Sequence, residues 1–145
     1  MKRAVIVGCG NIAAVHAAVL TAMEQVMLVG VADIHFEKAK NYAEKYNTTP
    51  YASLEEMIEK THPDVLHICT PHYLHVPMAV YALERGINVF MEKPPAITFE
   101  QLETLKSAVD ASPAKLGLCY QNRYNPSYRA AKEFIESGEA GKVLG

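Results

Sequence analysis

Two glycines close to the N-terminus have the spacing of a turn that could hold phosphate groups. The apolar residues 3–7 have the length of a buried strand, and they lead directly into the run Gly8-Cys9-Gly10-Asn11-Ile12-Ala13. Gly8 permits a tight turn, and the absence of a Cβ at Gly10 lets a pyrophosphate approach the backbone. A helix that begins here presents free N–H groups and a partial positive charge to an anion. The pattern predicts a dinucleotide site, whereas the alternative is a glycine turn that only lets a helix pack on a strand.

An acid at the required distance strengthens the first interpretation. The apolar run 26–32 ends at Asp33, about 20 residues beyond the glycine turn, as the dinucleotide fingerprint requires. A carboxylate there can accept hydrogen bonds from both ribose hydroxyls of an adenosine, and it repels a 2′-phosphate. No Arg follows Asp33 directly, although Lys38 lies one helical turn beyond it. We therefore expect NAD as the cofactor, with NADP as the alternative.

Further polar residues follow three later apolar runs. The segments are Thr70-Pro71-His72-Tyr73-Leu74-His75, Glu92-Lys93-Pro94-Pro95 and Gln121-Asn122-Arg123-Tyr124. If the runs are parallel strands, their carboxyl ends meet at one edge of the sheet, where open α/β folds bind ligands. A cofactor and a substrate would meet among these side chains.

The elements that must position these residues alternate along the whole chain. Predicted strands cover 3–7, 26–32, 50–51, 65–69, 88–91 and 115–120, and predicted helices cover 13–23, 36–46, 53–60, 77–85, 98–112 and 125–137. Ser53 and Thr98 each begin a capping box. Such alternation predicts an α/β fold, a doubly wound parallel sheet with helices on both faces.

Composition limits the classes of partner. The chain has 145 residues, 50% hydrophobic and 21% charged, with a formal net charge of −2. This size and composition suit one globular domain, and the charge gives no basic field for nucleic acid. No segment has the length of a membrane span, so we expect no membrane partner. Cys9, Cys69 and Cys119 contain no C-x-x-C pair. They are predicted to be reduced and mostly buried thiols in a cytoplasmic protein.

Three motifs together resemble the Gfo/Idh/MocA oxidoreductases over essentially the whole chain. They are the Gly8–Ala13 turn, the T-P-x-x-x-H pattern of 70–75, and Glu92-Lys93-Pro94. Members of that family carry a Rossmann domain followed by a second α/β domain built on a large, mostly antiparallel sheet. The resemblance implies that residues 1–122 form the dinucleotide-binding domain and that 123–145 begin the connection to a substrate domain absent from this chain.

The resemblance also implies roles for single residues. Lys93 would lie beside the nicotinamide and act on the substrate oxygen, against the alternatives of a salt bridge with Glu92 or a surface lysine. His75 could contact the nicotinamide side or could be structural, and His72 stands where many relatives carry Asn. Arg123 would bind cofactor or substrate, or an acidic neighbour. The expected cofactor contacts are Gly8, Gly10, Asn11, Ile12, Asp33, Thr70, Pro71, His75, Glu92 and Asn122.

The implied activity is hydride transfer between NAD and a hydroxyl-bearing carbon of a sugar, cyclitol or similar polyol. This chain alone is expected to bind cofactor without turning over substrate, and the full-length protein is expected to be a homo-oligomer. One alternative is a non-catalytic dinucleotide-binding sensor or assembly module. Another is a domain for a different nucleotide, such as a nucleoside-diphosphate sugar.

Metal and thiol chemistry are not expected from the spacing. Cys69, His72 and His75 carry donor atoms that suit zinc, but Pro71 and the turn give no assurance that they converge. Cys9 is not expected to be a nucleophile. His16 and His67 lie in apolar stretches and are predicted to be satisfied core or interface histidines.

Overall fold

The computed structural model describes residues 1–144, which contain one parallel sheet of six strands in the order β3-β2-β1-β4-β5-β6. The strands are β1 (Lys2–Val7), β2 (Val26–Ala32), β3 (Pro50–Tyr51), β4 (Val65–Ile68), β5 (Asn88–Glu92) and β6 (Leu116–Cys119). The order reverses between β1 and β4, so the carboxyl ends of these two strands form the switch point of a doubly wound sheet. The predicted fold class is confirmed.

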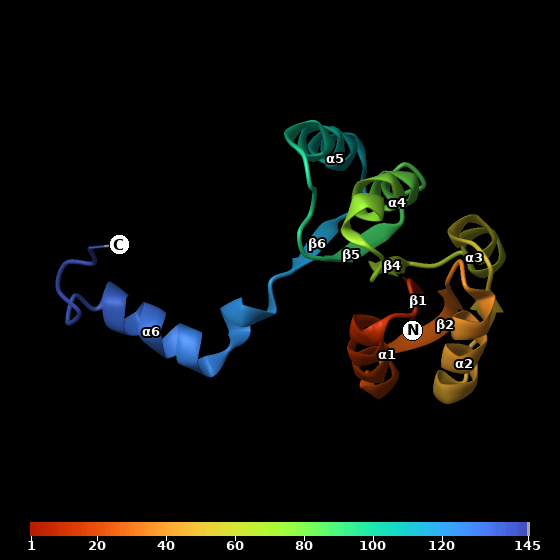
Figure 1. Cartoon of the computed structure of the whole chain (residues 1–145), viewed down its shortest axis with the longest axis horizontal. Helices are drawn as coiled ribbons and strands as arrows, with labels where there is room; N and C mark the ends of the chain where they lie inside the picture. The colour runs from red at the N-terminus through yellow and green to blue at the C-terminus, as the bar shows by residue number, and fades with distance from the viewer. Residues whose placement is uncertain (145) are drawn as a thin grey trace.

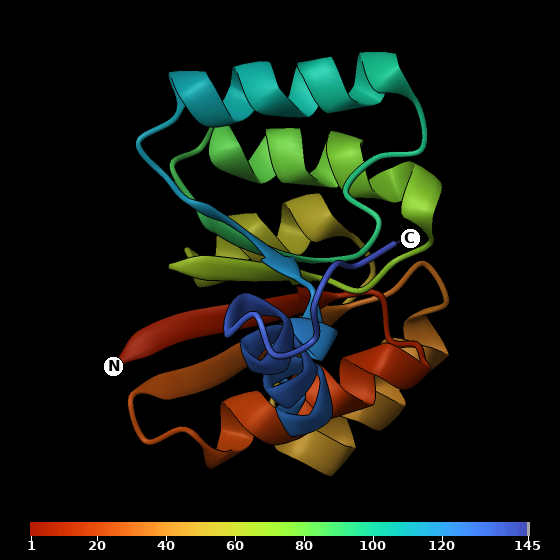
Figure 2. The ribbon, with the colours of Figure 1, turned by 90° about the vertical axis from the view of Figure 1, so that its left-hand side faces the viewer.

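Helices cover the sheet on both faces (Figure 1). Figure 2 shows α1 (Asn11–Ala22) and α2 (Phe36–Tyr46) on one face, and α3 (Leu54–Thr61), α4 (His75–Leu83) and α5 (Phe99–Ala111) on the other. Two buried apolar clusters fill the spaces between the layers. Ala13 and Ala17 of α1 are fully buried, and their small side chains let this helix pack close to the strands.

Most predicted elements agree with the structure to within two residues. Ser53 and Thr98 cap α3 and α5 as predicted, each accepting a hydrogen bond from the backbone N–H three residues later. Two helices begin two residues earlier than predicted: α1 at Asn11 rather than at residue 13, and α4 at His75 rather than at residue 77. A short 3-10 turn, His72–Leu74, leads into this helix, so Pro77 lies in its first turn, where a missing N–H costs nothing.

The last helix, α6 (Pro126–Glu136), projects away from the layered body (Figure 1). It follows a 3-10 turn, Gln121–Tyr124, and every described residue from Tyr120 onward is exposed. Phe134 and Ile135 therefore hold their apolar side chains in solvent. None of the helices in residues 1–144 combines the length and apolar character needed to cross a bilayer.

Candidate functional site

The glycine turn after β1 is fixed by close backbone packing. Gly8 has a φ of +89°, and a Cβ placed there would lie 2.7 Å from the carbonyl oxygen of Cys69. Only glycine fits this combination of left-handed backbone and close approach between the ends of β1 and β4. The hydroxyl of Tyr42 on α2 donates to the carbonyl of Gly10 and holds the far side of the turn.

Gly10 differs from Gly8 because nothing in the protein explains the absence of its side chain. Its φ is −91°, and a Cβ there would have no heavy atom within 4 Å. Gly10 is also the N-cap of α1 and forms no side-chain cap hydrogen bond, so the first N–H groups of this helix lack a side-chain partner there. The open space at Gly10 lies in a pocket that is lined by Gly8, Gly10, Asn11, Ile12, Asp33, Ile34, His35, Lys38, Thr70 and Pro71, among others.

Asp33 joins the glycine turn to the end of β2. One carboxylate oxygen accepts a hydrogen bond from the N–H of Cys9 at 2.8 Å, and the other accepts from the N–H of His35 at 2.8 Å. Each carboxylate oxygen has two lone pairs, so both can accept a second hydrogen bond from a ligand in the pocket. The same pocket contains the side chains of His35 and Lys38.

His75 lies behind the pocket rather than in it. The side chain is fully buried, with Nδ1 2.8 Å from the carbonyl oxygen of Pro94 and Nε2 3.0 Å from that of Thr70. The ring therefore links the segment after β4 to the segment after β5. Of the two roles considered from the sequence, this geometry is that of a structural histidine. Thr70 and Pro71, in contrast, line the pocket.

Lys93 is exposed at the end of β5, in a second pocket that it lines with Tyr120, Gln121, Asn122 and Arg123. Within residues 1–144 no salt bridge involves Lys93, so the alternative of a Lys93–Glu92 ion pair is not seen. The backbone N–H of Lys93 donates to the Glu92 carboxylate at 3.3 Å, and the Lys93–Pro94 peptide is cis. The structure thus places Lys93 and Asn122 together and apart from the glycine turn.

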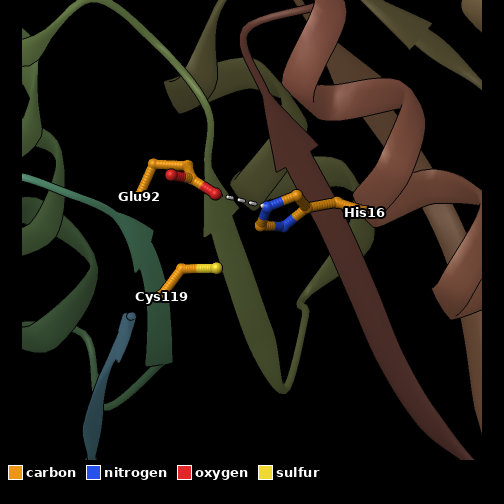
Figure 3. A group of neighbouring side chains, drawn as sticks. All are labelled: His16, Glu92 and Cys119. Atoms are coloured by element: carbon orange, nitrogen blue, oxygen red, sulfur yellow. Dashed lines mark hydrogen bonds and ion pairs between the residues drawn. The ribbon is translucent and has the colours of Figure 1, made fainter. Parts of the chain in front are cut away.

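Glu92 belongs to a polar cluster with His16, His67 and Cys119. Figure 3 shows three of these side chains, His16, Glu92 and Cys119. The strand register explains how these residues meet, because Glu92 pairs with Cys119 and His67 pairs with Phe90, two residues before Glu92 on the same face of β5. The face they share is that of α1, from which His16 reaches them. His16 Nε2 lies 3.1 Å from Glu92 Oε1, and His16 Nδ1 lies 2.9 Å from His67 Nδ1.

The ionisation of this cluster follows from burial and from these contacts. Burial works to raise the pKa of Glu92, but His16 and the Cys119 thiol beside it outweigh that effect and hold the pKa below its usual value. Burial, with His16 nearby, lowers the pKa of His67 to about 4, so this ring is neutral at pH 7. Burial and the neighbouring Glu92 carboxylate raise the pKa of Cys119 to about 11.

The other two cysteines are inert thiols. Burial and the charge of Asp33 raise the pKa of Cys9 to about 12, and burial raises that of Cys69. Cys69, His72 and His75 do not gather into a donor set, since the one such group among residues 1–144 consists of His16, Glu92 and Cys119.

Two features of this edge were not predicted from the sequence. The bond from Tyr42 to the glycine turn crosses between helices and has no local signal. The His16 cluster depends on which strands are neighbours and in which register, and the only hint in the sequence was that His16 and His67 occur in apolar stretches, where a polar side chain needs a partner.

Comparison with known proteins identifies the family. The model of the GFO_IDH_MocA oxidoreductase family, NAD-binding Rossmann fold, matches residues 2–120. Glucose-6-phosphate 3-dehydrogenase of Bacillus subtilis is 28% identical over 99% of this chain and 41% of its own length, and D-glucoside 3-dehydrogenase of Escherichia coli is 30% identical over 97% and 41%.

Solved structures agree with this assignment. The WlbA dehydrogenase from Bordetella pertussis, in complex with NADH and UDP-GlcNAcA, superposes with a TM-score of 0.92 at 28% identity, over 99% of this chain and 42% of that one. The chain thus spans about two-fifths of the length of the relatives it matches. It belongs to the Gfo/Idh/MocA oxidoreductases and comprises their NAD-binding Rossmann fold.

Proposed function

We propose that this chain is the cofactor-binding part of a dehydrogenase that oxidises a hydroxyl-bearing carbon of a sugar, cyclitol or similar polyol. The observation that carries the proposal is the open space at Gly10, where a glycine that the protein's own packing does not require faces the N-terminus of α1. A pyrophosphate is the group that such a turn accommodates. The two relatives named above are both sugar dehydrogenases, which supports this substrate class.

The residues of the first pocket would hold the adenosine half of the cofactor. Gly8 shapes the turn, while Gly10, Asn11 and Ile12 would place backbone N–H groups against the pyrophosphate. Asp33 would accept hydrogen bonds from the ribose hydroxyls with its remaining lone pairs. Thr70 and Pro71 would pack against the cofactor where the two strand ends meet.

Lys93 would act where the nicotinamide and the substrate meet. When bound, NAD supplies the carbon that accepts the hydride. The Lys93 ammonium would donate a hydrogen bond to the substrate oxygen and stabilise the negative charge that develops on that oxygen during hydride transfer. His75 and Glu92 would support this position, since one holds the carbonyl of Pro94 and the other accepts from the N–H of Lys93. Asn122 shares the Lys93 pocket and would contact the nicotinamide end.

The order of domains belongs to the same proposal. Residues 1–122 would be the complete dinucleotide-binding domain, and 123–145 would begin the connection to a substrate domain. Exposed apolar side chains on α6 and α1 support a further partner that covers these two helices. They are Phe134 and Ile135 of α6, and Val15 and Val19 on the outer face of α1. In the full-length protein, a homo-oligomer in our proposal, that surface would be covered by the second domain or another subunit.

A cytoplasmic location and small-molecule partners complete the proposal. The three cysteines are free, which suits a reducing compartment, and the net charge of −2 offers no field for nucleic acid or for an anionic membrane.

Cofactor choice is tested by titrating wild type and Asp33→Asn with NADH and NADPH. We expect wild type to prefer NADH and the variant to lose most of that preference, because the carboxylate repels a 2′-phosphate. An unchanged preference for NADH over NADPH in Asp33→Asn would show that this residue does not recognise the ribose.

The catalytic role is tested by Lys93→Ala in the full-length enzyme, with Lys115→Ala, another exposed lysine, as the control. We expect turnover to fall by about 100-fold or more while NADH affinity is kept. If turnover and substrate binding were both unaffected, Lys93 would have no part in catalysis. A non-catalytic dinucleotide-binding module would then be the better interpretation.

A further inference from the structure

The cluster of His16, Glu92 and Cys119 offers three different metal-binding groups at one point. One donor atom from each residue lies within 4.8 Å of the other two, and Figure 3 shows the three side chains converging. They come from α1, β5 and β6, so the fold itself positions them. We propose that these three residues bind a transition-metal dication of the zinc class.

The chemistry of the donors selects the ion. An imidazole nitrogen, a thiolate sulfur and a carboxylate oxygen are the ligands of Zn²⁺, whereas Ca²⁺ and Mg²⁺ require sets made of oxygen. Around a tetrahedral zinc the donor atoms lie about 3.5 Å apart, so the three groups need to contract by about 1 Å. Three protein ligands leave the fourth position for a water molecule. The Glu92 carboxylate and a Cys119 thiolate would together neutralise the charge of the ion.

The proposed ligands have hydrogen-bond partners of the kind that surround metal ligands in proteins. His16 Nδ1 lies 2.9 Å from His67 Nδ1, and the free oxygen of Glu92 accepts from the N–H of Lys93 at 3.3 Å. Partners of this kind orient ligating imidazoles and carboxylates. His16 and Glu92 are buried, but Cys119 is half-buried, which gives an ion a route from solvent.

Binding the ion requires that protons move. Without metal, His16 donates its Nε2 proton to Glu92 and Cys119 carries its thiol proton. When the ion binds Nε2, the His16 proton moves to Nδ1, which then donates to Nδ1 of a neutral His67 whose own proton has moved to Nε2. The thiol proton leaves to solvent as the sulfur–metal bond forms. No oxidation or reduction is involved.

Co²⁺ is the probe, because a cobalt–thiolate bond gives a charge-transfer absorption and a tetrahedral site gives visible bands. The 145-residue chain is freed of metal with a chelator, titrated with Co²⁺ and then competed with Zn²⁺. We expect one Co²⁺ per chain, a charge-transfer band, and displacement by Zn²⁺. Cys119→Ser should abolish the band, whereas Cys69→Ser, a matched change at a buried strand-end cysteine, should keep it.

Two further variants test the rest of the ligand set. Glu92→Gln and His16→Gln should each weaken Co²⁺ binding about tenfold or more, with far-UV circular dichroism confirming the fold. If Cys119→Ser does not fold, Cys119→Ala supplies the same test. The proposal is overturned if wild type gives no charge-transfer band, if the band survives in a folded Cys119 variant, or if Cys69→Ser loses it equally.

Discussion

The two halves of the sheet's carboxyl edge are formed by different kinds of groups, one by backbone and the other by side chains. Around β1 and β2 the pocket is made by backbone: a left-handed glycine, the N–H groups of a helix terminus, and a carboxylate that accepts from main-chain donors. Around β5 and β6 the edge is made by side chains, with Lys93 exposed above the buried contacts of Glu92 with His16.

Because of this difference, the two halves should respond to different changes, one to added volume and the other to pH. The backbone half should be sensitive to added volume: a methyl group at Gly8 should cost stability, and one at Gly10 should cost cofactor binding. Its N–H donors do not titrate. The side-chain half should respond to pH, because its buried groups have shifted pKa values.

The largest expected effect is that of Gly8→Ala, which breaks the backbone half. The new Cβ would lie 2.7 Å from the Cys69 carbonyl oxygen at a φ of +89°. We expect a loss of about 3 kcal/mol in the free energy of unfolding, measured by urea denaturation. Gly86→Ala, with positive φ but open space around its Cβ, is the control and should cost less. Equal losses in the two variants would mean that the close approach to the end of β4 adds nothing to the cost of Gly8→Ala.

A second effect concerns acid and the side-chain half. The pKa of His67 falls from 6.5 to about 4 on folding, so the unfolded chain binds this proton first as the pH drops. Stability contributed by the neutral ring is complete above pH 6.5 and is lost between about pH 6.5 and pH 4. We expect about 2 kcal/mol less stability at pH 4.5 than at pH 7.5 from this group.

Urea denaturation of wild type and His67→Gln at both pH values measures that contribution, with the exposed His35→Gln as the control. His67→Gln should lose less stability between the two pH values than wild type does. An identical pH dependence in the two proteins would show that His67 is not the group responsible.

Gly10→Ala should separate stability from cofactor binding within the backbone half. A Cβ at Gly10 meets no protein atom within 4 Å and the φ is ordinary, so the fold should keep its stability to within about 0.5 kcal/mol. The methyl group occupies the space assigned to the pyrophosphate, and we expect NADH to bind about tenfold more weakly, or about 1.4 kcal/mol. Unchanged NADH affinity in a folded variant would remove Gly10 from the site.

The smallest effect is expected outside both halves, in α6. Replacing Phe134 and Ile135 by Ser should change the stability of the chain by less than about 0.5 kcal/mol, because both side chains are exposed. Equilibrium urea denaturation measures it. A large loss would mean that α6 packs against the body in solution.

The two halves also differ in how far the sequence could predict them. The glycine turn and Asp33 lie within one strand–helix–strand unit, so the pocket could be predicted from their spacing in the sequence. The cluster of His16, Glu92 and Cys119 joins residues more than 100 positions apart. Its assembly depends on strand order and register, which no local pattern specifies.

Fluorescence titration of the 145-residue chain with NADH is the decisive test of whether the edge at β1 and β2 binds a dinucleotide. We expect saturable binding with one site per chain, weaker binding of NADPH, and competition by NAD. An absence of saturable binding by either reduced cofactor, in a chain shown to be folded, would contradict it.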